Sequence, residues 1–171
     1  EILPGEEYKG AGKEKGRLDE AAENQLCPTG AIVPDGDHVR ISAEICAGCG
    51  QCAAACPTGA ASYALPPADT LVHKLRAMLQ AYHLAGGARP VLLLHERGHG
   101  TALIEALARH GDGLPANVLP LAINEVTQIG LEAIVAAFAY GASAVRFLLR
   151  AKPLHDLTGL TQSVAMADII L

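Results

Sequence analysis

Four of the five cysteines in this 171-residue sequence lie within the stretch ICAGCGQCAAACP, residues 45–57. Cys46, Cys49, Cys52 and Cys56 are separated by two, two and three residues, and a proline follows the last of them. The odd cysteine count, the clustered spacing and the lack of a recognisable secretory signal favour metal binding in a reducing compartment over disulfides. We therefore expect a cytoplasmic protein whose thiolates bind metal.

The C-x2-C-x2-C-x3-C-P spacing is the one with which bacterial proteins hold [4Fe–4S] clusters. Because the iron corners of a cubane lie close together, several thiolates must come from one tight loop. Gly48 and Gly50 let that loop adopt positive φ angles and bring backbone N–H groups near the cluster sulfurs. Structural zinc, the main alternative, is usually held by two separated C-x2-C pairs. The spacing thus predicts an iron–sulfur cluster.

A shorter copy of the end of this motif occurs upstream. The sequence CPTGA appears at residues 27–31 and again at residues 56–60, so that its two cysteines are 29 positions apart. In two-cluster ferredoxins, the fourth cysteine of each run ligates the other cluster. Residues 18–65 therefore resemble the bacterial two-cluster ferredoxin module, with one half-unit ending at each copy.

This resemblance implies which cysteines act together. Cys27 would complete one [4Fe–4S] cluster with the trio Cys46, Cys49 and Cys52. Cys56, in a short helix expected to begin near Cys52, would have served the other cluster. The stretch LDEAAENQL just before Cys27 offers no thiolate where the first trio should lie, so that cluster site is lost. The alternative takes Cys56 rather than Cys27 as the fourth ligand; otherwise Cys56 is a small buried hydrophobic residue.

The net charge is confined to the cysteine-bearing half. Residues 1–65 hold 5 Lys/Arg against 10 Asp/Glu, a net charge of −5, whereas residues 66–171 hold 8 against 8. This acidity argues against nucleic acid, which binds basic surfaces, and indicates either a solvated face or a docking surface for a basic partner. No apolar stretch approaches the roughly 18 residues of a membrane span. Because the sequence starts at Glu1 and ends in an apolar stretch, we expect a piece of a longer protein.

Residues 1–65 and 66–171 are predicted to form separate domains. The first is an α+β ferredoxin-like iron–sulfur module with a degenerate first half. Its expected elements are a short helix at residues 18–26, a hairpin at residues 31–41 about a Pro-Asp-Gly turn, and the cysteine loop. The stretch ALPPA at residues 64–68 marks the boundary between the two domains.

The second domain alternates helical and extended patterns. Helical periodicity with glycine stops predicts helices at residues 69–85, 101–110 and 129–140, and a fourth within residues 155–167. Short apolar runs predict buried strands at residues 90–94, 117–123 and 144–149, although Pro120 weakens the middle one. This βαβαβ alternation predicts right-handed crossovers and a small α/β domain with a parallel sheet.

One loop of the second domain carries candidate ligands. His95, Glu96 and His99 could bind a metal ion together, but the loop provides no further ligand. Gly98 and Gly100 lie where phosphate-binding loops occur, yet the third glycine of a dinucleotide fingerprint is absent. The alternative is that this loop binds no ligand and is an ordinary strand-to-helix turn. No Ser/His/Asp or Cys/His arrangement emerges, so no catalytic residue is assigned and no small-molecule substrate is identified.

The second domain also resembles a known family. Its stretches PVLLLH, VLPL and IGLEAIVAAFAYGASAV, within residues 90–145, are similar to the delta subunit of viologen-reducing hydrogenases. That small α/β protein passes electrons to heterodisulfide reductase, so the resemblance implies an electron-transfer setting. The family carries cysteines for a [2Fe–2S] cluster in these loops, whereas no cysteine follows Cys56 here. We therefore expect residues 66–171 to bind no redox cofactor and to serve as a docking platform.

The whole layout looks like the C-terminal part of larger proteobacterial 4Fe–4S-binding proteins, which are often associated with formate dehydrogenase. Two functions are consistent with it. The first is a one-electron carrier with a single [4Fe–4S] cluster that docks to a redox protein or enzyme subunit. The second is an assembly or maturation factor for a redox enzyme, in which the cluster is structural or a sensor. An enzyme that uses a cleft of the α/β domain ranks last.

Overall fold

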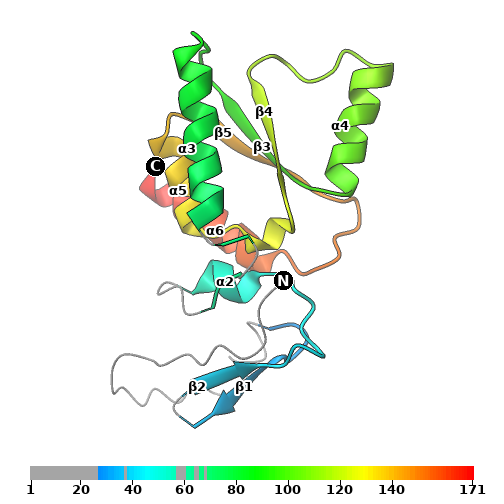
Figure 1. The fold of residues 1–171 in the computed structure, drawn as a ribbon, viewed down its shortest axis with the longest axis vertical. Coiled ribbons are helices and arrows are strands. Elements are labelled where there is room, and N and C mark those ends of the chain that lie inside the picture. The colour runs from blue at the N-terminus through cyan, green and yellow to red at the C-terminus, as the bar shows by residue number, and fades with distance from the viewer. Residues whose placement is uncertain (1–26, 37, 57–60, 64–65, 68) are drawn as a thin grey trace.

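The structure is a computed structural model that describes residues 27–171 except positions 37, 57–60, 64–65 and 68. Within these residues, Figure 1 shows a small part that carries β1, β2 and α2 and a larger part built on β3, β4 and β5. The predicted helix at residues 18–26 lies outside the described residues. The segment in which a first cysteine trio would be expected lies outside them too.

The hairpin predicted from its turn signal is present. β1 (Ile32–Asp35) and β2 (His38–Ile41) pair antiparallel. The turn begins at Gly36 rather than at Pro34, because Pro34 and Asp35 belong to β1. A strand of a two-stranded sheet has a free edge, where proline is tolerated. Gly36 has a φ of 65°, a left-handed value that favours glycine in tight hairpin turns.

A short helix follows the cysteine loop, as predicted. α2 spans Gln51–Ala55, so it begins just before Cys52 and ends just before Cys56. Gly50 precedes the helix with a left-handed φ of 77°. The backbone therefore turns sharply between the loop and the helix, which carries Cys52 back toward the preceding cysteines.

The larger part contains the predicted parallel sheet. β3 (Val91–Glu96), β4 (Val118–Ile123) and β5 (Ala144–Leu148) lie in the order β4-β3-β5, and both neighbours run parallel to β3. β3 continues to Glu96, beyond the apolar run from which it was predicted. β4 accommodates Pro120 because it is an edge strand, where a missing N–H can face solvent.

Helices cover both faces of this sheet (Figure 1). α3 (Asp69–Leu84), α5 (Leu131–Ala139) and α6 (Thr158–Ile170) gather on one face, whereas α4 (His99–His110) packs on the other face against β3. This placement agrees with right-handed crossovers to opposite sides of β3. The core lies between the sheet and the group of three helices, and its largest fully buried hydrophobic side chains include Leu75, Leu79, Leu92 and Ile129.

The end of α3 follows its glycine signal. The Gly86 N–H donates to the His83 carbonyl, and the Gly87 N–H donates to the Tyr82 carbonyl, both at 2.9 Å. These two bonds make a Schellman motif, in which glycine ends a helix. No helix in the described part of the chain is both long and apolar enough to cross a membrane.

The segment before α5 departs from the prediction of one helix over residues 129–140. Val126–Gln128 forms a separate 3-10 helix, η1, and α5 begins only at Leu131. Gly130 lies between them with an extended backbone. A side chain at Gly130 would collide with the chain, because its Cβ would lie 2.7 Å from the carbonyl oxygen of Ala54 in α2. The glycine therefore allows a close approach between α2 and this segment.

The two parts of the structure meet through α2. This helix contacts both η1 and α6, below the sheet in Figure 1. The cysteine loop is therefore packed against the α/β part within the described residues. The domain boundary at residues 64–68 stays a prediction, since most of that stretch lies outside the description.

Candidate metal centre

Cys27, Cys46, Cys49 and Cys52 line a single pocket, and none of the four is in a disulfide. The pocket measures about 310 Å³ including its open mouth. The rest of its wall is small or apolar apart from one hydroxyl, and consists of Thr29, Ala31, Ile32, Ile41, Ala47 and Gly50. The structure therefore brings together the four residues predicted as ligands, although Cys27 is distant from the others in sequence.

The hairpin brings Cys27 beside the cysteine loop. Beyond its paired strands, the Ser42 N–H donates to the Ala31 carbonyl at 2.8 Å, and the Cys46 N–H donates to the Ser42 carbonyl at 3.0 Å. On the other side, the Gly30 N–H closes a turn by donating to the Cys27 carbonyl at 3.0 Å. β1 and β2 thus hold the first CPTGA turn next to the loop that carries the other three cysteines.

Cys56 lies outside the lining of this pocket. It follows α2 with an extended backbone, φ −84° and ψ 107°, and it is partly buried. This arrangement favours Cys27 over Cys56 as the fourth ligand, in agreement with the exchange between half-units that the ferredoxin resemblance implies. The ligand set itself stays a prediction, which substitution of each cysteine will test.

The two glycines of the cysteine loop have the backbone conformation predicted for them. Gly48 and Gly50 have φ angles of 66° and 77°. At Gly50 there is also no room for a side chain, since a Cβ would lie 2.5 Å from the Tyr63 hydroxyl oxygen and 2.7 Å from Gln128 Cβ. A Cβ at Gly48 would meet nothing within 4 Å. Gly50 is therefore required both by the turn and by packing.

Backbone N–H groups lie close to the cysteine sulfurs. The Ala31 N–H donates to Cys27 Sγ at 3.2 Å. The sulfurs of Cys49 and Cys52 likewise interact with N–H groups of the backbone around them. Hydrogen bonds of this kind offset the negative charge of thiolates and are one of the factors that set the reduction potential of an iron–sulfur cluster.

Burial and neighbouring thiolates raise the pKa values of two of the thiols, those of Cys49 and Cys52. Burial raises the pKa of Cys52 to about 11, and the neighbouring thiolates add to the rise. Burial also raises the pKa of Cys49, again with contributions from Cys27 and Cys46. At Cys27 burial acts in the same direction, but hydrogen bonds from Thr29 and the backbone outweigh it and lower the pKa. Thiolates this close repel one another, and a positively charged iron–sulfide core would relieve the repulsion.

This donor set fits a cubane better than a single ion. A tetrahedral zinc ion needs its sulfur ligands about 2.3 Å from one point. Among the described residues, no group of three or more His, Cys, Asp or Glu side chains is arranged to hold a metal ion. A [4Fe–4S] cluster instead takes one thiolate at each of its separate iron corners. Four thiols spread around one pocket match that requirement.

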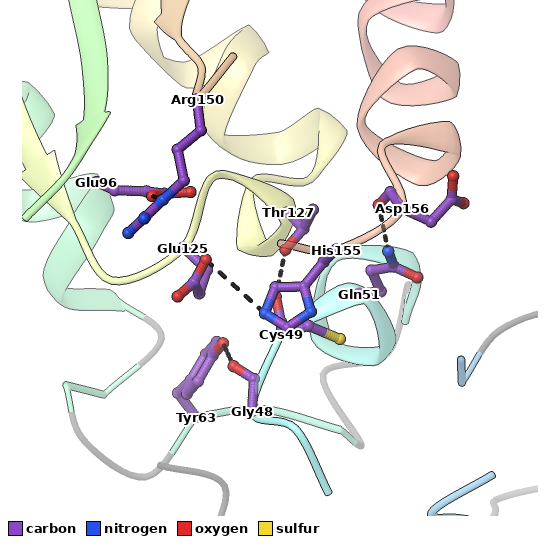
Figure 2. Close-up of polar contacts among 10 residues, drawn as sticks. All are labelled: Gly48, Cys49, Gln51, Tyr63, Glu96, Glu125, Thr127, Arg150, His155 and Asp156. Atoms are coloured by element: carbon purple, nitrogen blue, oxygen red, sulfur yellow. Dashed lines mark hydrogen bonds and ion pairs between the residues drawn. The ribbon is translucent and has the colours of Figure 1, made fainter. Parts of the chain in front are cut away.

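Side-chain hydrogen bonds hold the cysteine loop in place (Figure 2). Three of them end on backbone carbonyl oxygens: Tyr63 donates to Gly48 at 2.5 Å, Thr127 to Cys49 at 2.6 Å, and Gln51 to Asp156 at 2.5 Å. Those of Thr127 and Gln51 cross between the cysteine-bearing part and the α/β part. Both side chains are buried, so water competes little for these bonds.

A second polar cluster lies beside η1 at the carboxyl ends of the parallel strands (Figure 2). Glu96 at the end of β3 forms an ion pair with Arg150 at 2.5 Å, and Glu125 lies 4.0 Å from His155. Burial raises the pKa of Glu125 and the Glu96 carboxylate adds to the rise, whereas His155 and Arg150 oppose it. This edge of an α/β sheet often binds ligands, but here Arg150 of the chain itself pairs with Glu96.

The metal site considered for His95, Glu96 and His99 is not formed. His95 is buried, with Nδ1 3.1 Å from the Glu96 carbonyl oxygen, and the Glu96 carboxylate pairs with Arg150. Gly100 serves packing, because a Cβ there would lie 2.6 Å from His95 Cβ. Gly100 therefore allows the start of α4 to approach β3 closely.

Comparison with protein families addresses the cysteine loop directly. Residues 39–62 match the family model described as the 4Fe-4S binding domain. This match supports an iron–sulfur module in the chain. The matched range includes the run from Cys46 to Cys56 and begins after Cys27, so it does not choose between Cys27 and Cys56 as the fourth ligand.

The name of one curated relative also describes an iron–sulfur protein. Over 80 residues the chain is 31% identical to a probable iron–sulfur subunit of the Frd operon of Proteus vulgaris. The aligned stretch is 47% of this chain and 49% of the relative, so the chain spans about half the relative's length. No solved structure matches the chain significantly. The family match and the relative together support an iron–sulfur module in this chain.

The residues that hold the loop were not predicted from sequence. Gln51 is one of the unspecified positions of the cysteine motif, and Thr127 lies 78 positions away from its partner Cys49. One signal was present, because Thr127 stands between the apolar Val126 and Ile129, and a buried hydroxyl requires a partner. The sequence did not indicate which partner it would find.

Proposed function

We propose that this chain is a one-electron carrier with a single [4Fe–4S] cluster bound by Cys27, Cys46, Cys49 and Cys52. The pocket that these cysteines line carries the proposal, and the match to the 4Fe-4S binding domain supports it. We propose one cluster rather than two because the stretch before Cys27 offers no thiolate. When bound, the cluster supplies a centre that takes up and returns one electron.

The chain's own residues have two tasks in this proposal. The thiolates hold the cluster, and the backbone N–H groups at the sulfurs, such as that of Ala31 on Cys27 Sγ, offset its negative charge. The apolar wall of the pocket, which includes Ile32 and Ile41, limits the access of water on one side. The open mouth of the pocket leaves a route by which a partner can come close.

We propose that the partner is a redox protein or part of a redox enzyme complex. The name of the relative places that protein in the Frd operon and describes it as a probable iron–sulfur subunit, which supports a place in a redox complex. The net charge of −5 in residues 1–65 would steer a basic partner surface toward the cluster-bearing part. Residues 66–171 have no net charge, and a stretch of them within residues 90–145 resembles the hydrogenase delta subunit; they would form the docking platform.

An assembly or maturation factor with a structural cluster is the second candidate. The observation that favours it is the junction between the two parts, because Thr127 and Gln51 bind the cysteine loop to the α/β part. Losing the cluster would then disturb a surface that a client enzyme recognises. A cluster without redox activity, whose removal abolishes assembly of a co-purifying partner, would favour this candidate.

Electron transfer is tested on anaerobically purified protein by film voltammetry and rapid mixing with a co-purified redox partner. We expect a reversible one-electron couple and rapid reoxidation of the reduced cluster by that partner. Mass spectrometry of co-purifying proteins identifies the partner to use. The electron-carrier proposal fails if the cluster cannot be reduced and reoxidised reversibly.

The reduction potential is expected to lie in the lower half of the range known for iron–sulfur clusters, which is roughly −700 to +450 mV. All-thiolate ligation and the acidic residues 1–65 both favour the oxidised, less negative cluster. The midpoint potential from the same voltammetry checks this. A clearly positive midpoint potential would show that the surrounding N–H groups outweigh the negative charge.

A further inference from the structure

Two consecutive carbonyl groups of the cysteine loop accept hydrogen bonds from side chains that do not line the pocket. The carbonyl oxygen of Gly48 accepts the Tyr63 hydroxyl at 2.5 Å, and the carbonyl oxygen of Cys49 accepts the Thr127 hydroxyl at 2.6 Å. Neither Tyr63 nor Thr127 lines the cysteine pocket. Both carbonyl groups therefore point toward donors outside the pocket, as Figure 2 shows for the two pairs.

The geometry of the peptide bond determines where the N–H groups that follow these carbonyls point. In a planar trans peptide, the C=O and the following N–H point in opposite directions. Turning the Gly48 and Cys49 carbonyls outward thus turns the N–H groups of Cys49 and Gly50 toward the pocket. Two observations agree with this: Gly50 lines the pocket, and the Cys49 N–H interacts with the sulfur of its own residue.

Both donors are fixed in place. Thr127 is 2% exposed and belongs to η1, which packs on α2. The Tyr63 hydroxyl is held by its 2.5 Å bond to the Gly48 carbonyl oxygen. Gly50 lies so close to Tyr63 and Gln128 that a Cβ there would collide with both.

We infer that Thr127 and Tyr63 are positioning residues that set the reduction potential of the cluster by aiming the Cys49 and Gly50 N–H groups at it. The inference rests on the proposed electron-carrier function. N–H groups directed at the cluster stabilise its more negative, reduced form. Without the hydroxyl of Thr127, the Cys49–Gly50 peptide can rotate, and its carbonyl dipole then disfavours the added electron.

The test compares Thr127→Val with Thr127→Ser in the full, cluster-loaded chain. Valine keeps the shape of threonine and removes the donor, whereas serine keeps the donor. We expect Thr127→Val to lower the ratio of reduced to oxidised protein at a fixed potential by about tenfold, equal to about 59 mV for one electron. Thr127→Ser is expected to keep the wild-type midpoint potential. Tyr63→Phe should shift the potential in the same direction as Thr127→Val.

A merely structural role would change thermal stability or iron content and leave the potential of the retained cluster unchanged. A wild-type midpoint potential in Thr127→Val, with the cluster still bound, would therefore overturn the inference. Loss of the cluster from both Thr127→Val and Tyr63→Phe would also overturn the inference. The two hydrogen bonds would then stabilise the cysteine loop rather than set the reduction potential of the cluster. A wild-type protein without a reversible couple would contradict the proposed function itself. An unchanged potential in Thr127→Val would contradict only the inference, so the two failures are distinguishable.

Discussion

Serine in place of Cys27, Cys46, Cys49 or Cys52 is expected to remove most of the visible absorbance and iron of the cluster, whereas Cys56→Ser should leave both largely intact. A serine hydroxyl is a far weaker ligand for iron than a thiolate, and the four residues share one pocket that Cys56 does not line. Absorbance and iron content of each anaerobically purified variant measure the effect.

Cys27 and Cys56 provide a matched comparison, since each begins a copy of the same CPTGA sequence. Circular dichroism of the metal-free variants controls for folding. Loss of the cluster in Cys56→Ser together with its retention in Cys27→Ser would show that the exchange between half-units does not apply to this chain.

Replacing Gly50 by alanine should destabilise the protein strongly and prevent cluster binding. A non-glycine residue in the left-handed conformation costs about 1–2 kcal/mol, and Gly50 has a φ of 77°. Its Cβ would in addition collide with Tyr63 and Gln128, and overpacking of this kind typically costs a further 1–3 kcal/mol or so. Thermal unfolding of the metal-free protein and iron content of the loaded protein measure both effects.

Gly36→Ala is the matched control for this change. Gly36 has a similar φ of 65°, but a Cβ there would meet nothing within 4 Å. We therefore expect Gly36→Ala to lose only the backbone contribution to stability and to keep its iron. If Gly50→Ala unfolds at the same temperature as Gly36→Ala and binds as much iron, the packing around Gly50 is looser than the structure indicates.

The features that sequence predicted well are local ones. The spacing from Cys46 to Cys56 predicts the cluster type, because a tight loop around a cubane needs those separations. The positive φ angles of Gly48 and Gly50 follow from the same loop and are confirmed. The hairpin and the parallel sheet were also predictable, since turn residues and apolar runs encode them over a few positions.

The features that sequence could not predict depend on contacts between distant segments. The hydrogen bond from Thr127 to Cys49 joins residues 78 positions apart, and no local pattern encodes it. α5 begins at Leu131, two residues later than its apolar pattern predicted, and the close approach of Gly130 to Ala54 just before it is not encoded locally. Pro120 weakened the prediction of β4, yet the position of that strand at the sheet edge, which makes proline acceptable, became visible only in three dimensions.

The most direct test of the account is analysis of iron, acid-labile sulfide and zinc in the anaerobically purified chain, combined with EPR of the reduced protein. A single cubane held by Cys27, Cys46, Cys49 and Cys52 predicts about four iron and four sulfide per chain and the signal of one reduced [4Fe–4S] cluster. About eight iron per chain, or zinc in place of iron, would contradict it.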